Sequence, residues 1–127
     1  MRLNSRRTWR GIISDRRIDS TVIELKKEIE SLPEIAIRPM FGYQCYSVNG
    51  KFFAGFGIKH KSKVIIRLSK DLQLEALLEE DRLKIEPFRH GAKRGWIELD
   101  ISNTRSHEAF YLVKKGYEHA LNISKST

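Results

Sequence analysis

The sequence predicts a single α+β domain in which helices pack on a curved antiparallel sheet. The strand-like runs are clustered along the chain instead of alternating with helices, which favours α+β over a parallel α/β sheet. Three further segments carry apolar residues at helical spacing. The predicted order is helix, four strands, helix, two strands, helix. With 127 residues the chain can bury a core of its own, and we assign 18–123 to the domain and 1–17 to a basic arm.

The first helix is predicted to begin at Asp19 or Ser20, either of which can cap it. Its apolar stripe is formed by Val22, Leu25, Ile29 and Leu32. Pro33 ends it, since proline removes a donor and clashes with the preceding turn. A strand over 34–38 follows, with Ile35 and Ile37 on one face, and it is expected to end at Pro39.

Asn49-Gly50 lies between two apolar-rich runs and predicts a two-residue hairpin turn, because both residues tolerate positive φ. Counting outward from this turn pairs Ser47 with Phe52, Cys45 with Ala54, and Tyr43 with Phe56. These six side chains are expected on the buried face. The other face is expected to carry Gln44, Tyr46, Lys51 and Phe53.

The second half adds a strand over 63–68, after a basic turn at 59–62. Ser69 is expected to cap a helix that runs to about Glu80, with its inward side formed by Leu72, Leu74, Leu77 and Leu78. Strands over 82–86 and 96–101 follow. Ser106 is expected to cap a last helix whose stripe is Phe110, Val113, Tyr117 and Leu121. Gly116, which lowers helix propensity, is expected to mark a close contact.

The net charge of +8 is unevenly distributed. Residues 1–17 contain six arginines and one aspartate, whereas the remaining 110 residues have a net charge of only +3. Such an arm suits contact with phosphates, but it also suits a solvated terminus or an organelle transit peptide. The single cysteine, the lack of a long apolar run and the lack of a secretory signal predict a cytoplasmic protein that does not enter a membrane.

The candidate nucleic-acid contacts are basic residues of the arm and of the loop over 87–95. They are Arg6, Arg7, Arg10, Arg16, Arg17, Arg89, Lys93 and Arg94. This loop, the turn at 59–61 and the arm are expected to form one basic surface, with Trp9 or Trp96 as stacking area beside it. A protein partner is the competing expectation for the same surface, and a homodimer is a third candidate.

No residue pattern points to catalysis, a metal or a cofactor. His60, His90, His107 and His119 are far apart in sequence and lack the ligand spacing of a zinc site. Cys45 is interpreted as a core residue, since a nucleophilic thiol needs a base nearby. Gly55-Phe56-Gly57 lacks the rest of a phosphate-binding loop and is interpreted as a strand end in close contact with a neighbour.

Met40-Phe41-Gly42, followed by a run from Val48 to Ala54, resembles the amino-terminal domain of the TfoX competence regulators. The run over 93–99 and the helix that carries Tyr117 resemble the related YjbR (MmcQ-like) proteins. The resemblance covers about residues 20–120 and implies the α+β sheet, without a catalytic residue to carry over. It interprets Met40, Phe41, Gly50 and Phe53 as fold residues that serve turn geometry and core packing.

Together these observations predict a small non-catalytic binding or adaptor module, in DNA-related or transcriptional regulation. Two alternatives remain open. One is a nucleic-acid-binding protein that acts through the basic arm. The other is a small ligand-binding domain or enzyme that uses a face of the sheet, lined by Tyr46, Phe53 and Trp96.

Overall fold

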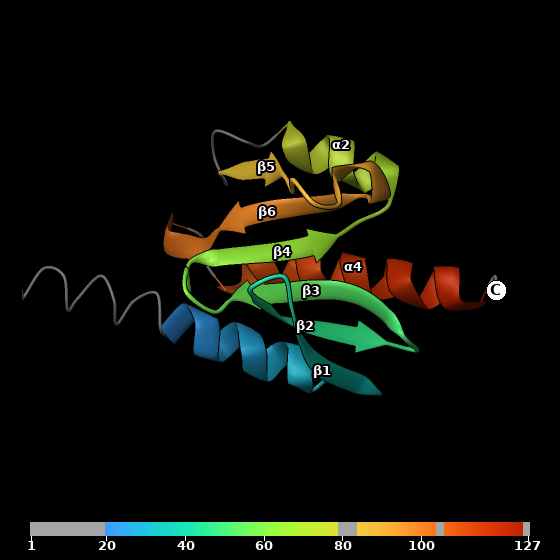
Figure 1. The fold of residues 1–127 in the computed structure, drawn as a ribbon, viewed down its shortest axis with the longest axis horizontal. Coiled ribbons are helices and arrows are strands. Elements are labelled where there is room, and N and C mark those ends of the chain that lie inside the picture. Colours follow the sequence, from blue (N-terminus) through green and yellow to red (C-terminus); the bar gives the residue numbers. More distant parts are fainter. Residues whose placement is uncertain (1–19, 79–83, 104–105, 126–127) are drawn as a thin grey trace, which may run out of the picture.

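The computed structural model describes residues 20–78, 84–103 and 106–125 of the chain, so the predicted arm lies outside the described residues. Six strands form one antiparallel sheet in the order β1-β2-β3-β4-β6-β5 (Figure 1). The strands are β1 (Ile35–Met40), β2 (Tyr43–Val48), β3 (Lys51–Gly57), β4 (Lys63–Arg67), β5 (Ile85–Pro87) and β6 (Trp96–Asp100). The predicted fold class and element order are confirmed.

The helices cover one face of this sheet. They are the first helix (residues 20–30), α2 (Lys70–Leu77) and α4 (Ser106–Lys125), and two short 3-10 turns, η1 (Ala92–Arg94) and η2 (Ile101–Asn103), flank β6. In Figure 1, α4 passes behind β3 and β4, and the first helix lies beside β1. None of the helices in the described ranges is long and apolar enough to cross a membrane.

The main core lies between the helices and the sheet. Leu25 and Ile29 of the first helix are fully buried in it, as the apolar stripe predicts. Val113 of α4 is also fully buried, and Tyr117 contacts Phe53 edge to face with ring centroids 5.4 Å apart. A smaller cluster on the opposite face consists of Cys45, Ile65 and Phe88, with Met40, Tyr43, Phe52 and Trp96 packed against it.

The predicted hairpin register holds only for the first pair. Ser47 pairs with Phe52, but a bulge between Tyr46 and Ser47 then shifts the register, so that Cys45 pairs with Gly55 and Tyr43 with Gly57. The predicted pairs of Cys45 with Ala54 and Tyr43 with Phe56 are therefore wrong. The bulge accommodates one extra residue, Phe53, on β3. Because side chains alternate along a strand, the residues of β3 after Phe53 point to the opposite face from the one predicted.

The face assignment of the hairpin changes accordingly. Tyr46, Phe53, Ala54 and Phe56 all lie in the helix-covered core, whereas Cys45 lies in the smaller cluster on the other side. Tyr46 and Phe53 are fully buried, so they cannot line a cleft. Of the three residues proposed for a ligand face, only Trp96 remains available.

Two further expectations need correction. The helix capped by Ser69 forms, and Leu72 donates its backbone N–H to Ser69 Oγ at 3.3 Å, but Leu74 and Leu78 are 64% and 86% exposed. The buried residues of α2 are Gln73 and Ala76. β1 also continues through Pro39, because an edge strand tolerates a residue without an N–H.

Gly116 makes the close contact that its position in a helix predicted. A Cβ atom at this residue would lie 2.8 Å from the carbonyl oxygen of Arg67 and 3.0 Å from Ile66 Cγ2. The absence of a side chain therefore allows α4 to pack directly on the backbone of β4.

Candidate ligand site on the open face of the sheet

The face of the sheet opposite α4, called the open face below, has no helix over it in the described ranges (Figure 1). A row of paired residues crosses the whole sheet on this face: Arg38, Cys45, Gly55, Ile65, Glu98 and Glu86. Residues two positions away along each strand point the same way. Arg67 of β4 and its partner Trp96 of β6 therefore also lie on the open face.

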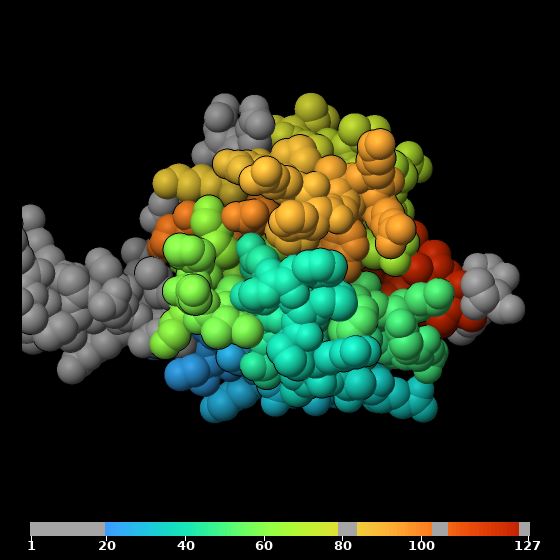
Figure 2. All heavy atoms as spheres, in the orientation of Figure 1, coloured from blue at the N-terminus to red at the C-terminus, as the bar shows by residue number. Residues whose placement is uncertain are grey.

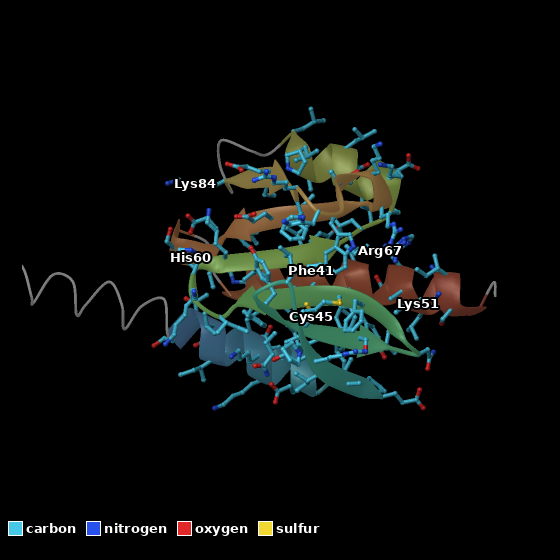
Figure 3. The ribbon with its side chains drawn as sticks, in the orientation of Figure 1. Phe41, Cys45, Lys51, His60, Arg67 and Lys84 are labelled. Carbon is cyan, nitrogen blue, oxygen red and sulfur yellow. The ribbon has the colours of Figure 1, made fainter. Side chains whose placement is uncertain are left out.

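A hollow of about 220 Å³ lies on this face, between the β1–β2 turn, the start of β3 and the loop before β6. Four aromatic side chains line it: Phe41, Phe52, Phe88 and Trp96. Three cationic side chains line it as well: Lys51, Arg67 and Arg94, called the rim cations below. Figure 3 shows Phe41, Cys45, Lys51 and Arg67 in this region, contributed by four separate segments.

Phe41 occupies an unusual backbone position. It forms the β1–β2 turn with Gly42, and the two residues have φ angles of +54° and +80°. Phe41 is 72% exposed, and its ring stacks on the His90 imidazole, with ring centroids 5.9 Å apart and planes 9° apart. In Figure 2 this turn, in turquoise, meets the orange segment near residue 90. The expectation that Phe41 serves core packing is therefore wrong.

The floor of the hollow is apolar. Phe88 contacts Tyr43 and His90 edge to face, at 5.6 Å and 5.5 Å between ring centroids, and lies 6.4 Å from Trp96. Cys45 is buried below these rings, as expected of a core cysteine, and burial raises the pKa of its thiol to about 11. A thiol that stays protonated is a poor nucleophile.

The rim cations line one hollow, and among the described residues no ion pair joins them to a carboxylate. Arg67 donates a hydrogen bond from Nε to the carbonyl oxygen of Arg94 at 3.1 Å, which holds the two arginines side by side. Burial lowers the pKa of Arg67, and the positive charge of Arg94 lowers it further. None of the described residues that line the hollow carries a carboxylate. This end of the open face therefore offers positive charge to an anion.

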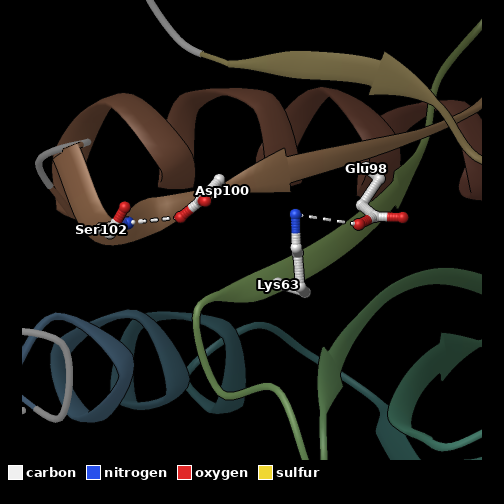
Figure 4. A network of polar contacts seen from close by, with 4 residues as sticks. All are labelled: Lys63, Glu98, Asp100 and Ser102. Carbon is white, nitrogen blue, oxygen red and sulfur yellow. Dashed lines mark hydrogen bonds and ion pairs between the residues drawn. The ribbon is translucent and has the colours of Figure 1, made fainter.

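Two carboxylates of the open face that do not line the hollow belong to Glu98, the β6 partner of Ile65, and Asp100, the β6 partner of Lys63. Lys63 pairs with Glu98 at 3.4 Å between Nζ and Oε1, and Ser102 donates its backbone N–H to Asp100 Oδ1 at 2.9 Å (Figure 4). Burial alone would raise the pKa of Asp100. The Ser102 hydrogen bonds and the charges of Lys63 and Lys84 outweigh burial and lower it.

Three of the eight predicted nucleic-acid contacts lie within the described residues, and all three belong to the same loop. Arg89, Lys93 and Arg94 are exposed in the loop before β6, and Arg94 lines the hollow. The turn at 59–62 lies at the opposite end of β4 from Arg67 and Arg94, where Figure 3 labels His60. The remaining five, Arg6, Arg7, Arg10, Arg16 and Arg17, lie outside the described residues.

Four residues of the hollow were not singled out by sequence as ligand contacts: Phe41, Lys51, Arg67 and Phe88. Arg67 could have been found from the strand pattern, since it shares the alternation of Ile65 and faces Trp96. Phe41-Gly42 lacked the usual turn composition and gave no such signal. The described residues contain no group of three or more His, Cys, Asp or Glu that could hold a metal ion.

These features define a class: a small α+β domain with one helix-covered face and one open face that carries a charged, aromatic hollow. The chain belongs to the YjbR family, whose model matches residues 30–119 and so includes the whole sheet. The resemblance to YjbR-like proteins is confirmed. No curated protein matches the chain.

A solved structure supports the fold. The crystal structure of a Deinococcus radiodurans protein with a DUF419 domain superimposes with a TM-score of 0.65 at 15% identity. The alignment covers 76% of this chain and 75% of that chain. At this level of identity the similarity shows the shared architecture alone.

Proposed function

We propose that this YjbR-family domain is a non-catalytic binding module in DNA-related regulation, and that nucleic acid is its ligand. The rim cations, together with Arg89 and Lys93 of the neighbouring loop, would contact phosphates. The basic segment at 1–17 would add further phosphate contacts, which need only positive charge within reach.

The observation that carries this proposal is the separation of charge on the open face. Positive side chains gather around the hollow without a lining carboxylate, whereas Glu98, on the strand beside the hollow, and Asp100, at the far end of that strand, are engaged with Lys63 and Ser102. Clustered cations repel one another, and a bound polyanion would relieve that repulsion.

Fluorescence anisotropy of a labelled DNA at two salt concentrations tests the proposal. One variant replaces Arg89, Lys93 and Arg94 by glutamine, and a second replaces the five arginines Arg6, Arg7, Arg10, Arg16 and Arg17. A matched control replaces three exposed lysines far from the hollow, Lys27, Lys59 and Lys114.

Both test variants should bind more weakly and show a shallower salt dependence, because fewer phosphates are neutralised. The log–log slope should become smaller by about 0.9 for each duplex phosphate that the variant no longer neutralises. The control should retain most of the affinity. Equal decreases in affinity for all three variants would indicate a general effect of net charge and contradict a site on the open face.

A protein partner is the second candidate, and a different part of the surface favours it. Ile23 of the first helix and Ile58 after β3 are 54% and 53% exposed and line a second hollow of about 370 Å³. Exposed apolar area rimmed by polar residues is typical of protein contacts. Static light scattering of the wild type and of Ile58→Glu tests whether this surface joins two copies of the chain.

A further inference from the structure

We propose that the hollow on the open face holds a single unpaired base of a nucleotide, with the ring among the aromatic side chains and the phosphate on the rim cations. This inference rests on the proposed function and adds which part of the nucleic acid is recognised. The ligand chemistry is an aromatic heterocycle joined to a phosphate. Its source is either a free nucleotide or a nucleotide within a single strand.

The size of the hollow limits what can enter it. Pockets for drug-sized ligands have volumes of roughly 300–1,000 Å³. The hollow, at about 220 Å³, is smaller, so it suits one ring system with the rest of the ligand outside. A base pair in a duplex cannot enter it, because its ring faces are covered by neighbouring bases.

The lining matches a base in chemistry as well as in size. Phe41, Phe88 and Trp96 present aromatic surface to one cavity, and bases stack on aromatic side chains whatever their sequence. One face of the Phe41 ring stacks on the imidazole of His90, which also lines the hollow, and this contact fixes the orientation of the phenyl ring. A stacking surface is therefore already in place without a ligand.

The backbone at Phe41 gives an independent reason to assign this ring a role in binding. The other two-residue hairpin turn, Asn49-Gly50, has φ angles of +51° and +77°, almost those of Phe41-Gly42. Asparagine is favoured at such a position, whereas a bulky side chain there is strained. Since Phe41 is also largely exposed, neither turn geometry nor core packing explains a phenyl ring at this site.

The rim cations lie where the phosphate of a base in the hollow would emerge. Arg67 and Arg94 are held together by the 3.1 Å hydrogen bond, and Lys51 lines the same cavity from β3. Arg89 and Lys93 continue the positive charge beyond the hollow along the loop. A strand could thus place one base inside and its neighbouring phosphates on the loop.

The test compares two labelled single strands of about 12 nucleotides, a length within the range that single-strand sites cover. One strand carries ordinary bases and the other carries abasic sites throughout, so that the phosphates are the same. With the full chain, the ordinary strand should bind about tenfold more tightly, the scale expected for one stacked base. Equal binding would overturn the base pocket while leaving the phosphate contacts of the proposed function intact.

Two variants locate the effect. Phe41→Asn keeps a residue suited to the turn and removes the ring, and it should abolish the preference for the ordinary strand without changing the affinity for the abasic strand. Tyr111→Asn is the matched control, since Tyr111 is a 59% exposed aromatic on α4, on the other side of the sheet. Loss of the preference in the control alone, or retention of it in Phe41→Asn, contradicts the assignment.

Deoxyadenosine monophosphate then distinguishes the two sources. Displacement of the labelled strand by the free nucleotide, together with the preference for bases, shows that one nucleotide is enough. The same preference without displacement shows that the strand delivers the base. If neither strand binds, the proposed function fails. The base pocket is then tested separately, by measuring whether this nucleotide quenches the tryptophan fluorescence of the wild-type protein. Quenching that is lost in Phe41→Asn supports the pocket, and no quenching overturns it.

Discussion

The side chain of Gln73 donates a hydrogen bond of 3.2 Å from Nε2 to the carbonyl oxygen of Trp96. The same nitrogen donates to the carbonyl oxygen of Ala92 at 2.8 Å. Gln73 is buried in α2, whereas Ala92 and Trp96 lie in the segment that carries Arg94. One amide thus joins α2 to the loop that forms the wall of the hollow.

Replacing Gln73 by methionine should destabilise the protein by about 1–3 kcal/mol. The change keeps the volume but removes the two hydrogen bonds that Gln73 donates and the one that it accepts from Lys70 Nζ at 3.4 Å, each of about 1 kcal/mol. The effect should not be larger, since the carbonyl of Trp96 still accepts from Phe88 and that of Ala92 from Gly95. Urea unfolding measures it. Leu74→Met on the exposed side of the same helix is the control and should change little.

Replacing Gly116 by alanine should lower the free energy of unfolding by about 1–3 kcal/mol, the usual cost of overpacking. Helix propensity alone would make the alanine variant more stable by about 1 kcal/mol, so a decrease in the free energy of unfolding would show that the close contact dominates. A Cβ atom would overlap the carbonyl oxygen of Arg67. Asn122→Ala, at an exposed position of α4, should not destabilise, and a stabilised Gly116→Ala protein would contradict the close contact.

Exchanging the first residues of the two hairpin turns should have opposite effects. Phe41→Asn should raise the free energy of unfolding by up to about 1 kcal/mol, because asparagine relieves the strain of positive φ. Asn49→Phe should lower it, since it introduces that strain and removes the 3.3 Å hydrogen bond to Ser124. Thermal unfolding of both variants checks the pair, and a destabilised Phe41→Asn protein would assign the ring a structural role.

The thiol of Cys45 should react slowly with iodoacetamide in the folded protein. Burial raises its pKa to about 11 from the ordinary 9.0, and the thiolate is the reactive form. At pH 8 the reaction should be about 100-fold slower than in urea, from the thiolate fraction alone. Because the sequence has a single cysteine, mass spectrometry reads the rate without ambiguity. Similar rates in both conditions would place the thiol at the surface.

The contribution of His119 to the free energy of unfolding should decrease as the pH falls below the ordinary pKa of histidine. Burial lowers the pKa of His119, and the positive charge of Arg67 lowers it further. The unfolded chain therefore binds the proton first, so the stabilisation is complete above the unfolded pKa and is lost toward the folded one. An NMR titration should show a higher pKa for His119 in Arg67→Gln, whereas Lys114→Gln should leave it unchanged.

The hairpin shows how far the sequence predicts the fold and where it stops. Asn49-Gly50 correctly located the turn and the pair of Ser47 with Phe52, because turn residues act locally. The bulge beside Tyr46 has no such local signal. It places Phe53 against Tyr117 of α4, more than sixty positions along the chain, so it depends on packing that the hairpin sequence does not contain.

The site was predicted in part for a similar reason. Charge composition pointed to Arg89, Lys93 and Arg94, because a loop of basic residues is visible without a structure. The pairing of Arg67 with the Arg94 carbonyl requires β4 and β6 to be neighbours. The leucines of α2 likewise led to a wrong prediction of its buried face. Gln73 is buried instead, because its side chain donates to a backbone carbonyl oxygen of a loop that is distant in sequence.

The packing of α4 has a consequence for synthesis of the protein on the ribosome. α4 covers β2, β3 and β4, and Tyr117 donates a hydrogen bond to the Pro33 carbonyl oxygen across 84 positions of the chain. Until this helix emerges, a nascent chain can pair its first four strands and cover part of their apolar side with the first helix, but the part that α4 covers stays exposed. The domain therefore completes its core only when the residues of α4 have left the ribosome and are free to pack.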